Sequence, residues 1–420
     1  MAAEDFKSLL QVSPALTNEL LSEALTEWFK EPVTFTHWEY VGDTGKGDSY
    51  LSEVIRIKIY GDANDTSKYV QVVLKNIPKN VCRRLTYRSD EFFKNEINFY
   101  LKVVPKLLEF QATKNVADPF KGFTKLFLAY SDGLNDVVCL EDANIEGFGT
   151  HKLRQEGIDY EHCKVTIKSL AQFHALSFAL RDQNPELLNR ISDALFETYY
   201  DPRLWDWYER FWKRVCGIAI DAVEKEFPNS VYLEKVKEFS VPERYEDMIR
   251  AVRDKTNAVI SHGDSWTNNF LFKYEGDTPV GAKIIDFQLS RCASPVLDIV
   301  FFIYACTDQV LREKYYDELL KYYHEVLSTQ ISGLGSDPLK VYPWETFMAE
   351  VKKYSYFGLA FSFESTPFII LAPEDAVSMD MEGDKKKNIE DFWQIPPIRT
   401  KEGRLREANN IVHCVDRGYI

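Results

Sequence analysis

Residues 261–290 of the chain read SHGDSWTNNFLFKYEGDTPVGAKIIDFQLS, and this stretch decides the predicted fold. Residues 270–274 and 280–285 have the apolar and aromatic composition of two short strands, and the turn-forming cluster EGDTP separates them. The pattern predicts a β-hairpin, in which residues equally distant from the turn lie opposite each other. Asn269, just before the first strand, and Asp286, just after the second, should therefore meet at the open end of the hairpin.

A third polar side chain, Asp264, lies on the loop that leads into this hairpin and can face the same space. A carboxylate and an amide oxygen placed side by side, as in Asp286 and Asn269, are hard ligands suited to Mg²⁺. A second carboxylate nearby can orient or deprotonate a hydroxyl group. Solvated charges at the end of a hairpin would explain either aspartate taken alone, whereas the whole constellation indicates a site for chemistry.

The segment HGDSWTNN at residues 262–269 has the H-x-D-x-x-x-x-N spacing of the kinase catalytic loop, and Asp286-Phe287-Gln288 stands where kinases carry the metal-binding D-F-G motif. H-G-D combined with D-F-Q resembles the aminoglycoside phosphotransferase and choline kinase superfamily, whose members phosphorylate small molecules. H-G-D-x-W followed by D-F-Q resembles, more closely, the ecdysteroid kinase-like (CHK kinase-like) family of insects. The resemblance extends over nearly the whole chain. It implies an α+β, two-lobed protein-kinase-like fold with a small antiparallel β N-lobe and a larger, mainly helical C-lobe.

Composition narrows the class of protein further. The chain has 420 residues, 45% of them hydrophobic, which is enough to build one or two domains. Its formal charge of −14 argues against nucleic-acid binding, and no apolar run approaches the roughly 20 residues of a membrane helix. Residues 1–10 lack the basic start and apolar middle of a signal peptide, and the seven scattered cysteines form no C-x-x-C pair. These features predict a cytoplasmic protein with reduced thiols and no nucleic-acid or membrane partner.

A glycine-rich segment near the start of the chain is a candidate phosphate-binding loop. Strands are expected at residues 33–41 and 49–60 on its two sides, and the segment offers Gly45, Gly47 and Ser49 as candidate phosphate contacts. The kinase pattern G-x-G-x-x-G is not matched letter for letter at this position.

A third strand, YVQVVLKNI at residues 69–77, places Lys75 near its end with apolar residues on both faces. A lysine in such a setting is partly desolvated and needs an anion. The helix predicted at residues 90–104 carries Glu96 at the edge of its apolar arc. Each residue alone would be an ordinary edge charge. Together they match the kinase ion pair that holds the α- and β-phosphates of ATP.

The predicted sheet ends at a segment that resembles the adenine-reading hinge of the superfamily, formed by Leu140, Glu141 and Asp142. A hinge reads adenine with its backbone, so the residues themselves indicate only a linker. This linker is the expected boundary between an N-lobe at residues 1–141 and a C-lobe at residues 142–420 that contains the catalytic loop and the acceptor site.

The remaining pattern is mainly helical, with helices expected at residues 6–29, 160–181, 199–227, 295–306, 311–328, 344–366 and 404–415. His174 is expected to be a hydrogen-bonded core histidine, and Asp298 is expected to brace the catalytic loop. The aromatic residues of 199–212 are expected to form core, although some could wall an acceptor pocket. Residues 379–397 are predicted to form a mobile surface loop.

The predicted reaction is transfer of the γ-phosphoryl group of ATP to a hydroxyl of a small-molecule acceptor by a monomeric enzyme. Asp264 would orient and deprotonate that hydroxyl. Asn269 and Asp286 would hold Mg²⁺, and Lys75, positioned by Glu96, would clamp the nucleotide. The resemblance implies an ecdysteroid-like or other lipophilic or xenobiotic alcohol as acceptor. Two alternatives remain open: a choline- or ethanolamine-type kinase, and a non-catalytic nucleotide- or steroid-binding protein on a kinase scaffold.

Overall fold

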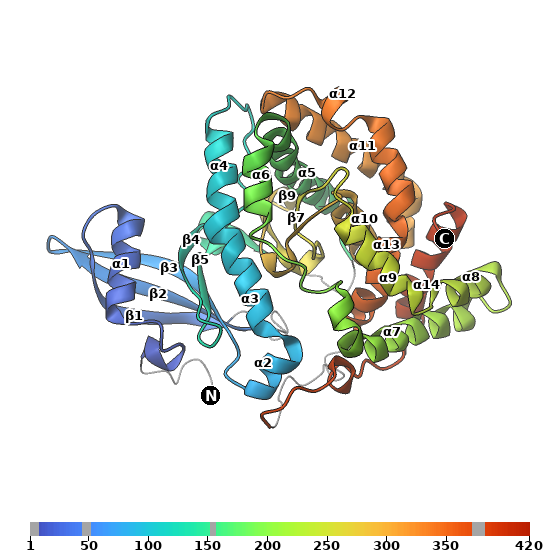
Figure 1. Ribbon diagram of the computed structural model, residues 1–420, viewed down its shortest axis with the longest axis horizontal. Helices are drawn as coiled ribbons and strands as arrows, with labels where there is room; N and C mark the ends of the chain where they lie inside the picture. Colours follow the sequence, from blue (N-terminus) through green and yellow to red (C-terminus); the bar gives the residue numbers. More distant parts are fainter. Residues whose placement is uncertain (1–7, 44–51, 152–156, 372–382) are drawn as a thin grey trace.

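The computed structural model describes residues 8–43, 52–151, 157–371 and 383–420, which fold into two lobes (Figure 1). The N-lobe is built on a five-stranded antiparallel sheet with the strand order β1-β2-β3-β5-β4. Its strands are β1 (Thr34–Asp43), β2 (Glu53–Ala63), β3 (Thr66–Asn76), β4 (Leu126–Tyr130) and β5 (Val137–Glu141). The sheet lies on the left of Figure 1 and the larger helical lobe on the right, so the predicted two-lobed α+β, kinase-like fold is confirmed.

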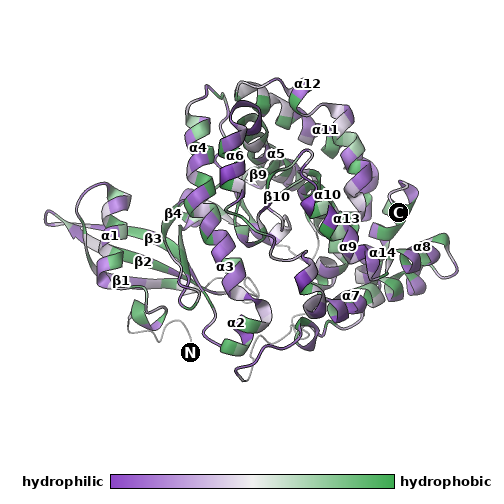
Figure 2. Cartoon of the chain, in the orientation of Figure 1, coloured by the Kyte–Doolittle hydropathy of each residue, from purple (hydrophilic) through white to green (hydrophobic). Residues whose placement is uncertain are grey.

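The long hairpin of β2 and β3 organises the N-lobe. Its turn residues, Asn64 and Asp65, have positive φ angles of 47° and 61°, as the type I′ turn of a two-residue hairpin requires. Alternate side chains of both strands are buried under α1 (Asn18–Phe29), and the hydrophobic strands stand out in green in Figure 2. The alternation turns Val73 and Lys75 to the opposite face of the sheet, where they line a cleft.

The segment that carries Glu96 is helical but irregular. α3 (Ser89–Asn98) passes into a π-helical turn (Phe99–Val103) and then into α4 (Val104–Ala112). Pro105 has no N–H for the carbonyl four residues before it, and its ring would clash with that carbonyl. The helix widens just before this proline, which accommodates the ring without breaking the helix.

The C-lobe is mainly helical. Its described helices are α5 (Tyr160–Gln183), α6 (Pro185–Ser192), α7 (Trp205–Glu226), α8 (Val231–Phe239), α9 (Glu243–Arg253), α10 (Val296–Cys306), α11 (Gln309–Gly333), α12 (Pro338–Val341), α13 (Trp344–Ile370) and α14 (Lys401–Asp416). α10 is buried along its whole length and packs against α13. The helices approach closely at Gly358, where a Cβ atom would lie 2.5 Å from the carbonyl oxygen of Val300. Among the described helices, none is both long and apolar enough to cross a membrane.

The hairpin predicted from the sequence is present. Its strands are β8 (Phe270–Glu275) and β9 (Thr278–Ile284), beside which lie β6 (Phe148–Thr150) and a separate pair of β7 (Val259–Ser261) with β10 (Arg291–Ala293). Phe270 pairs with Ile284, and the N–H of Ile285 donates to the carbonyl of Asn269 at 3.0 Å. This register places Asn269 and Asp286 at the same open end of the hairpin, as predicted.

Two predicted helices have different bounds. The helix expected at residues 6–29 is a short 3₁₀ turn (Leu9–Gln11) followed by α1, because the Thr17 side chain accepts the Leu20 N–H at 3.2 Å and caps a new helix. The helix expected from residue 199 begins at Trp205, after a 3₁₀ turn (Pro202–Leu204).

The prediction of a mobile loop at residues 379–397 is wrong for its described part, residues 383–397. Ile389 and Ile395 are buried, and Glu390 forms an ion pair with Arg214 of α7. Asp391 pairs with Arg210 of the same helix at 2.9 Å. These ion pairs and buried isoleucines hold the segment against the C-lobe.

Candidate active site

Asp298 of α10 holds the catalytic loop from behind. It is 2% exposed and accepts the backbone N–H groups of His262 and Gly263 at 2.7 and 2.8 Å. His174, fully buried, contacts the same carboxylate through Nε2 at 3.1 Å and the Tyr323 hydroxyl through Nδ1 at 2.8 Å. Both expectations are thereby confirmed: Asp298 braces the loop, and His174 is a hydrogen-bonded core histidine.

Gly263 brings the catalytic loop against the segment that follows the hairpin. Its φ angle is +83°, and a Cβ atom there would lie 2.1 Å from the carbonyl oxygen of Leu289. A larger residue would therefore clash and be strained. His262 ties the same two segments together, since its Nε2 lies 2.8 Å from the carbonyl oxygen of Ile285 and its Nδ1 accepts the N–H of Asp264 at 3.2 Å. Burial lowers the pKa of His262, which keeps the ring neutral and suited to these two roles.

Asp264 and Asn269 form one hydrogen-bonded unit. The Asn269 amide nitrogen donates to Asp264 Oδ2 at 2.9 Å and to the Asp264 carbonyl at 2.8 Å. Burial raises the pKa of Asp264 to about 7, and the negative charge of Asp286 adds to this effect. A carboxylate with a pKa near neutrality can take up a proton at physiological pH.

Asp286 has a left-handed backbone conformation just after the end of β9. Its φ of 65° and ψ of 67° lie in a region that few non-glycine residues adopt, although aspartate and asparagine do so more often than others. Its Oδ1 lies 2.8 Å from Lys75 Nζ, and Lys75 Nζ lies 2.7 Å from Glu96 Oε2. Burial opposes the charge of Lys75, but the carboxylates of Asp286 and Glu96 outweigh it and raise the pKa of Lys75. The structure thus joins the Lys75–Glu96 pair of the N-lobe to the hairpin of the C-lobe.

The donor atoms around the hairpin end fit a hard divalent cation. Asn269 uses its nitrogen on Asp264, which leaves its amide oxygen for a metal ion, and Asp286 has a second carboxylate oxygen beside the one that meets Lys75. Among the described residues, no group of three or more His, Cys, Asp or Glu side chains is arranged to hold a metal ion. A Mg²⁺ ion at Asn269 and Asp286 would therefore complete its coordination with water molecules and phosphate oxygens, as is usual in kinases.

A cleft between the lobes adjoins this constellation. Lys75, Glu96 and Asp286 line it, together with the three predicted hinge residues, Leu140, Glu141 and Asp142. The Asp142 side chain is 2% exposed and accepts from Gln71 Nε2 at 2.8 Å, so it stabilises the hinge and is not free to read a ligand. The candidate phosphate contacts Gly45, Gly47 and Ser49 lie outside the described residues.

Sequence reasoning missed several lining residues of this cleft, among them Arg56, Thr124, Asn268 and Leu271. Arg56 could have been predicted from the sequence. It alternates with the isoleucines of β2, which are buried on one face of the sheet, and therefore lies on the opposite face, which lines the cleft.

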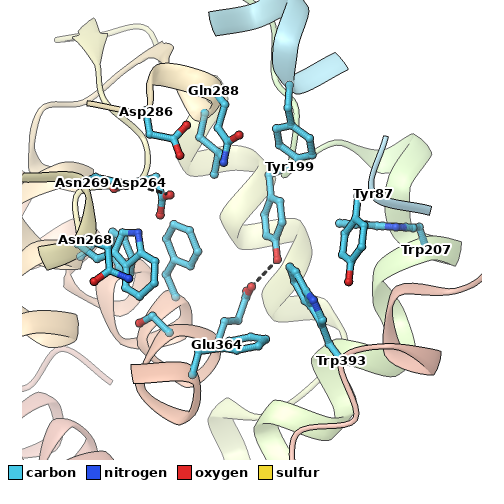
Figure 3. A pocket seen from close by; sticks show the side chains of 17 residues that line it. Tyr87, Tyr199, Trp207, Asp264, Asn268, Asn269, Asp286, Gln288, Glu364 and Trp393 are labelled. Atoms are coloured by element: carbon cyan, nitrogen blue, oxygen red, sulfur yellow. Dashed lines mark hydrogen bonds between the residues drawn. The ribbon is translucent and has the colours of Figure 1, made fainter. Parts of the chain in front are cut away.

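A second, aromatic pocket opens on the other side of the catalytic residues (Figure 3). It encloses about 980 Å³ of space that contains no protein atoms, including the open mouth of the pocket. Nine of its 17 lining residues are aromatic: Tyr87, Phe92, Tyr199, Trp207, Trp266, Phe301, Phe361, Phe368 and Trp393. Asp264, Asn269 and Asp286 form one wall. Trp393 comes from the segment that was predicted to be a mobile loop.

The predicted aromatic segment 199–212 divides between pocket and core. Tyr199 and Trp207 line the pocket, whereas Tyr200, Tyr208 and Phe211 are fully buried. Some aromatic residues of this segment therefore form core, and others form the wall of a pocket.

Glu364 of α13 is the polar residue across the pocket from the aspartates (Figure 3). The Tyr199 hydroxyl donates to it at 2.5 Å, the Tyr208 hydroxyl also donates to it, and Tyr200 lies at 3.5 Å. Burial raises the pKa of Glu364 to about 8. The sequence analysis did not single out this residue, although an acid within the apolar run FGLAFSFESTPF was an available signal.

The two-lobed fold, the cleft between the lobes and the aspartate–asparagine constellation define a kinase-like protein. The chain belongs to the ecdysteroid kinase-like family, whose model matches residues 46–336, well over half of the chain. It is thus a member of a family of small-molecule kinases. No curated protein sequence matches the chain.

Solved structures of low sequence identity resemble the chain. One is the ethanolamine kinase of Plasmodium vivax, with 13% identity, a TM-score of 0.43, and coverage of 91% of this chain and 83% of that one. Another is the GDP complex of aminoglycoside 2′-phosphotransferase-IIIa, with 15% identity, a TM-score of 0.36 and coverage of 82% and 90%. An aminoglycoside-3′-phosphotransferase of type VIII has 13% identity, a TM-score of 0.30 and coverage of 82% and 98%.

Proposed function

We propose that the protein transfers the γ-phosphoryl group of ATP to a hydroxyl group of a lipophilic alcohol, of ecdysteroid or xenobiotic type. One observation supports this proposal above the others. Asp286 and Asn268 line both the interlobe cleft and the aromatic pocket, so the two spaces meet at the hairpin end. A nucleotide in the cleft and an alcohol in the pocket would have their reacting ends at the same residues.

The chain's own residues supply the steps of this transfer. Asp264 accepts a hydrogen bond from the acceptor hydroxyl and aims its oxygen at the γ-phosphorus. A bond forms between that oxygen and the phosphorus, the bond from the phosphorus to the leaving oxygen of ADP breaks, and the hydroxyl proton passes to Asp264. Lys75, held by Glu96, pairs with phosphate oxygens of the nucleotide. A Mg²⁺ ion at Asn269 and Asp286 would neutralise charge on the phosphates.

The lining of the pocket supports a lipophilic acceptor. Flat aromatic side chains from α3, α7, α10 and α13 surround most of the space and would bury a rigid apolar body. The polar groups gather at the catalytic wall and at Glu364, which suits a molecule whose reacting hydroxyl stands at one end.

A second candidate acceptor is an amino alcohol of choline or ethanolamine type. Asp264, Asp286 and Glu364 all line the pocket, and its described lining includes no Lys or Arg. Carboxylates beside aromatic faces attract an ammonium group. The elevated pKa of Glu364 favours the lipophilic acceptor, because a protonated Glu364 offers no charge to a cation.

Release of ADP from Mg·ATP, measured with separate panels of ecdysteroids, other lipophilic alcohols and amino alcohols, tests the proposal. We expect turnover with the lipophilic panels and its loss in Asp264→Asn, whereas the exposed turn variant Asp277→Asn stays active. Turnover with amino alcohols alone would establish the second candidate. Nucleotide binding without turnover on any panel would establish a binding protein and refute both.

A further inference from the structure

A separate cavity in the C-lobe is lined by several charged residues. Residues of α5, α6, α9 and β10 and of the segment 193–197 line it. Its basic lining residues are Arg181, Arg253, Lys255 and Arg291, and its acidic lining residues are Asp193 and Glu197. Arg253 also pairs with Asp201, outside the lining, at 2.9 Å, so these four positive side chains face three carboxylates and the surplus is one positive charge, in a chain whose formal charge is −14.

Arg291 is the most deeply buried of the basic residues that line this cavity. It is 4% exposed, and its Nε lies 3.1 Å from Glu197 Oε2 and 3.2 Å from the Leu289 carbonyl oxygen. Its Nη2 is buried and has no hydrogen-bond partner among the described residues. A buried guanidinium group that is only partly paired is costly, and an oxygen anion in the cavity would lower that cost through the group's positive charge.

The other cations stand where they can share such an anion. Arg181, half-buried on α5, uses Nη1 on the carbonyl oxygen of Ala258 at 3.0 Å, and a guanidinium group has further N–H donors. Lys255 reaches over the cavity to the carbonyl oxygen of Cys292. Two guanidinium groups and an ammonium group around one space match the several acceptor oxygens of a phosphate group.

We propose that this cavity binds a phosphate dianion, either inorganic phosphate or the phosphate group of a small phosphorylated molecule. The surplus positive charge around the cavity attracts a phosphate group, whose charge approaches −2 at neutral pH. The oxygens of the ligand accept hydrogen bonds from N–H groups of Arg291 and Arg181 that have no acceptor among the described residues of the protein. Lys255 contacts the ligand from the edge of the cavity.

Glu197 competes with the ligand for Arg291. Its Oε1 accepts the backbone N–H groups of Tyr199 and Tyr200, each at 2.8 Å, while its Oε2 pairs with Arg291. Neutralising Glu197 therefore removes a negative charge from the cavity wall and strengthens phosphate binding. A glutamine at this position keeps an oxygen for the two N–H groups.

Calorimetric titration of the full-length protein with inorganic phosphate, glycerol phosphate and acetate tests the proposal. We expect phosphate to bind, and Arg181→Gln and Lys255→Gln each to weaken binding about tenfold, as the loss of one charge-assisted hydrogen bond predicts. Glu197→Gln should strengthen it. Arg190→Gln, an exposed charge on α6 outside the cavity lining, is the matched control and should bind as the wild type does.

The nucleotide cleft is the other place where phosphate would bind, so Lys75→Met is titrated in parallel. Binding that Lys75→Met abolishes and Arg181→Gln leaves intact would place the ion in the cleft and overturn the proposal. Absence of phosphate binding at millimolar concentration, or acetate binding as tight as phosphate, would also overturn it. Binding of glycerol phosphate in preference to inorganic phosphate would identify a phosphorylated small molecule as the ligand. Since this site shares no lining residue with the catalytic pocket, the outcome is independent of the proposed kinase activity.

Discussion

Replacing Asp264 by asparagine separates the chemical step from nucleotide binding. Asparagine keeps an oxygen that can accept from Asn269 but cannot take the acceptor's proton. An orienting or general-base group contributes about 10²–10⁴-fold, so kcat should fall within that range, which corresponds to about 3–5 kcal/mol in the barrier. The ATP affinity should change little, because Asp264 does not line the interlobe cleft.

The pH dependence gives this prediction a second readout. The pKa of Asp264 is raised to about 7, and the ionised form is the one that accepts a proton. The wild-type rate should therefore rise with pH up to about 7 and then level off, whereas the Asp264→Asn rate should lack this step. Steady-state assays of ADP release between pH 5.5 and 8.5 measure both profiles. Equal kcat values for the two proteins, or the same step in both profiles, would refute the assignment.

The same substitution should change stability in the opposite direction. An acid whose pKa is raised by folding stabilises the native state below its unfolded value, near 3.8, and this stability is lost as the pH rises through about 7. At pH 8 the ionised Asp264 costs up to about 4 kcal/mol, about 1 kcal/mol more than at pH 6. Urea denaturation should therefore show that Asp264→Asn is more stable than the wild type, by a margin that grows from pH 6 to pH 8. A variant less stable than the wild type at pH 8 would contradict this reasoning.

Three further predictions concern the residues around Asp264. Asp286→Ala should abolish stabilisation by Mg·ATP in a thermal-shift assay while the protein stays folded, and unchanged stabilisation would remove Asp286 from the metal site. Lys75→Met and Glu96→Gln should each lower kcat/KM, and their effects in the double mutant should be less than additive because the two side chains are 2.7 Å apart; full additivity would show that they act independently. Glu364→Gln should raise the KM of the acceptor but not that of ATP, since it lines only the aromatic pocket; a change confined to the ATP KM would contradict its placement.

Local patterns were sufficient to predict the hairpin and its polar end. The register of β8 and β9 follows from a short turn and from alternating side chains, so Asn269 and Asp286 could be placed together from the sequence alone. The pairing of Lys75 with Glu96 was also within reach, because the two residues are 21 positions apart on neighbouring elements.

Contacts between distant parts of the chain could not be predicted in this way. Asp286 and Lys75 are 211 positions apart, and the structure shows that Lys75 also donates to Asp286, the proposed metal ligand. Glu364 meets Tyr199 across 165 positions, and Trp393 lines the same pocket from a segment that was predicted to be a mobile loop. Which side chains meet across such separations depends on how the helices pack and in which direction each residue points.

The sequence by itself therefore determined the hairpin, the loop before it and the identity of their polar residues, because these depend on spacing and alternation within short segments. The two-lobed architecture was implied by the family resemblance. The acceptor pocket was decided only by tertiary structure, since its wall is assembled from α3, α7, α10, α13 and residue 393. The charged cavity has the same origin, because only the fold brings Arg181, Lys255 and the buried Arg291 around one space and makes them candidates for binding an anion.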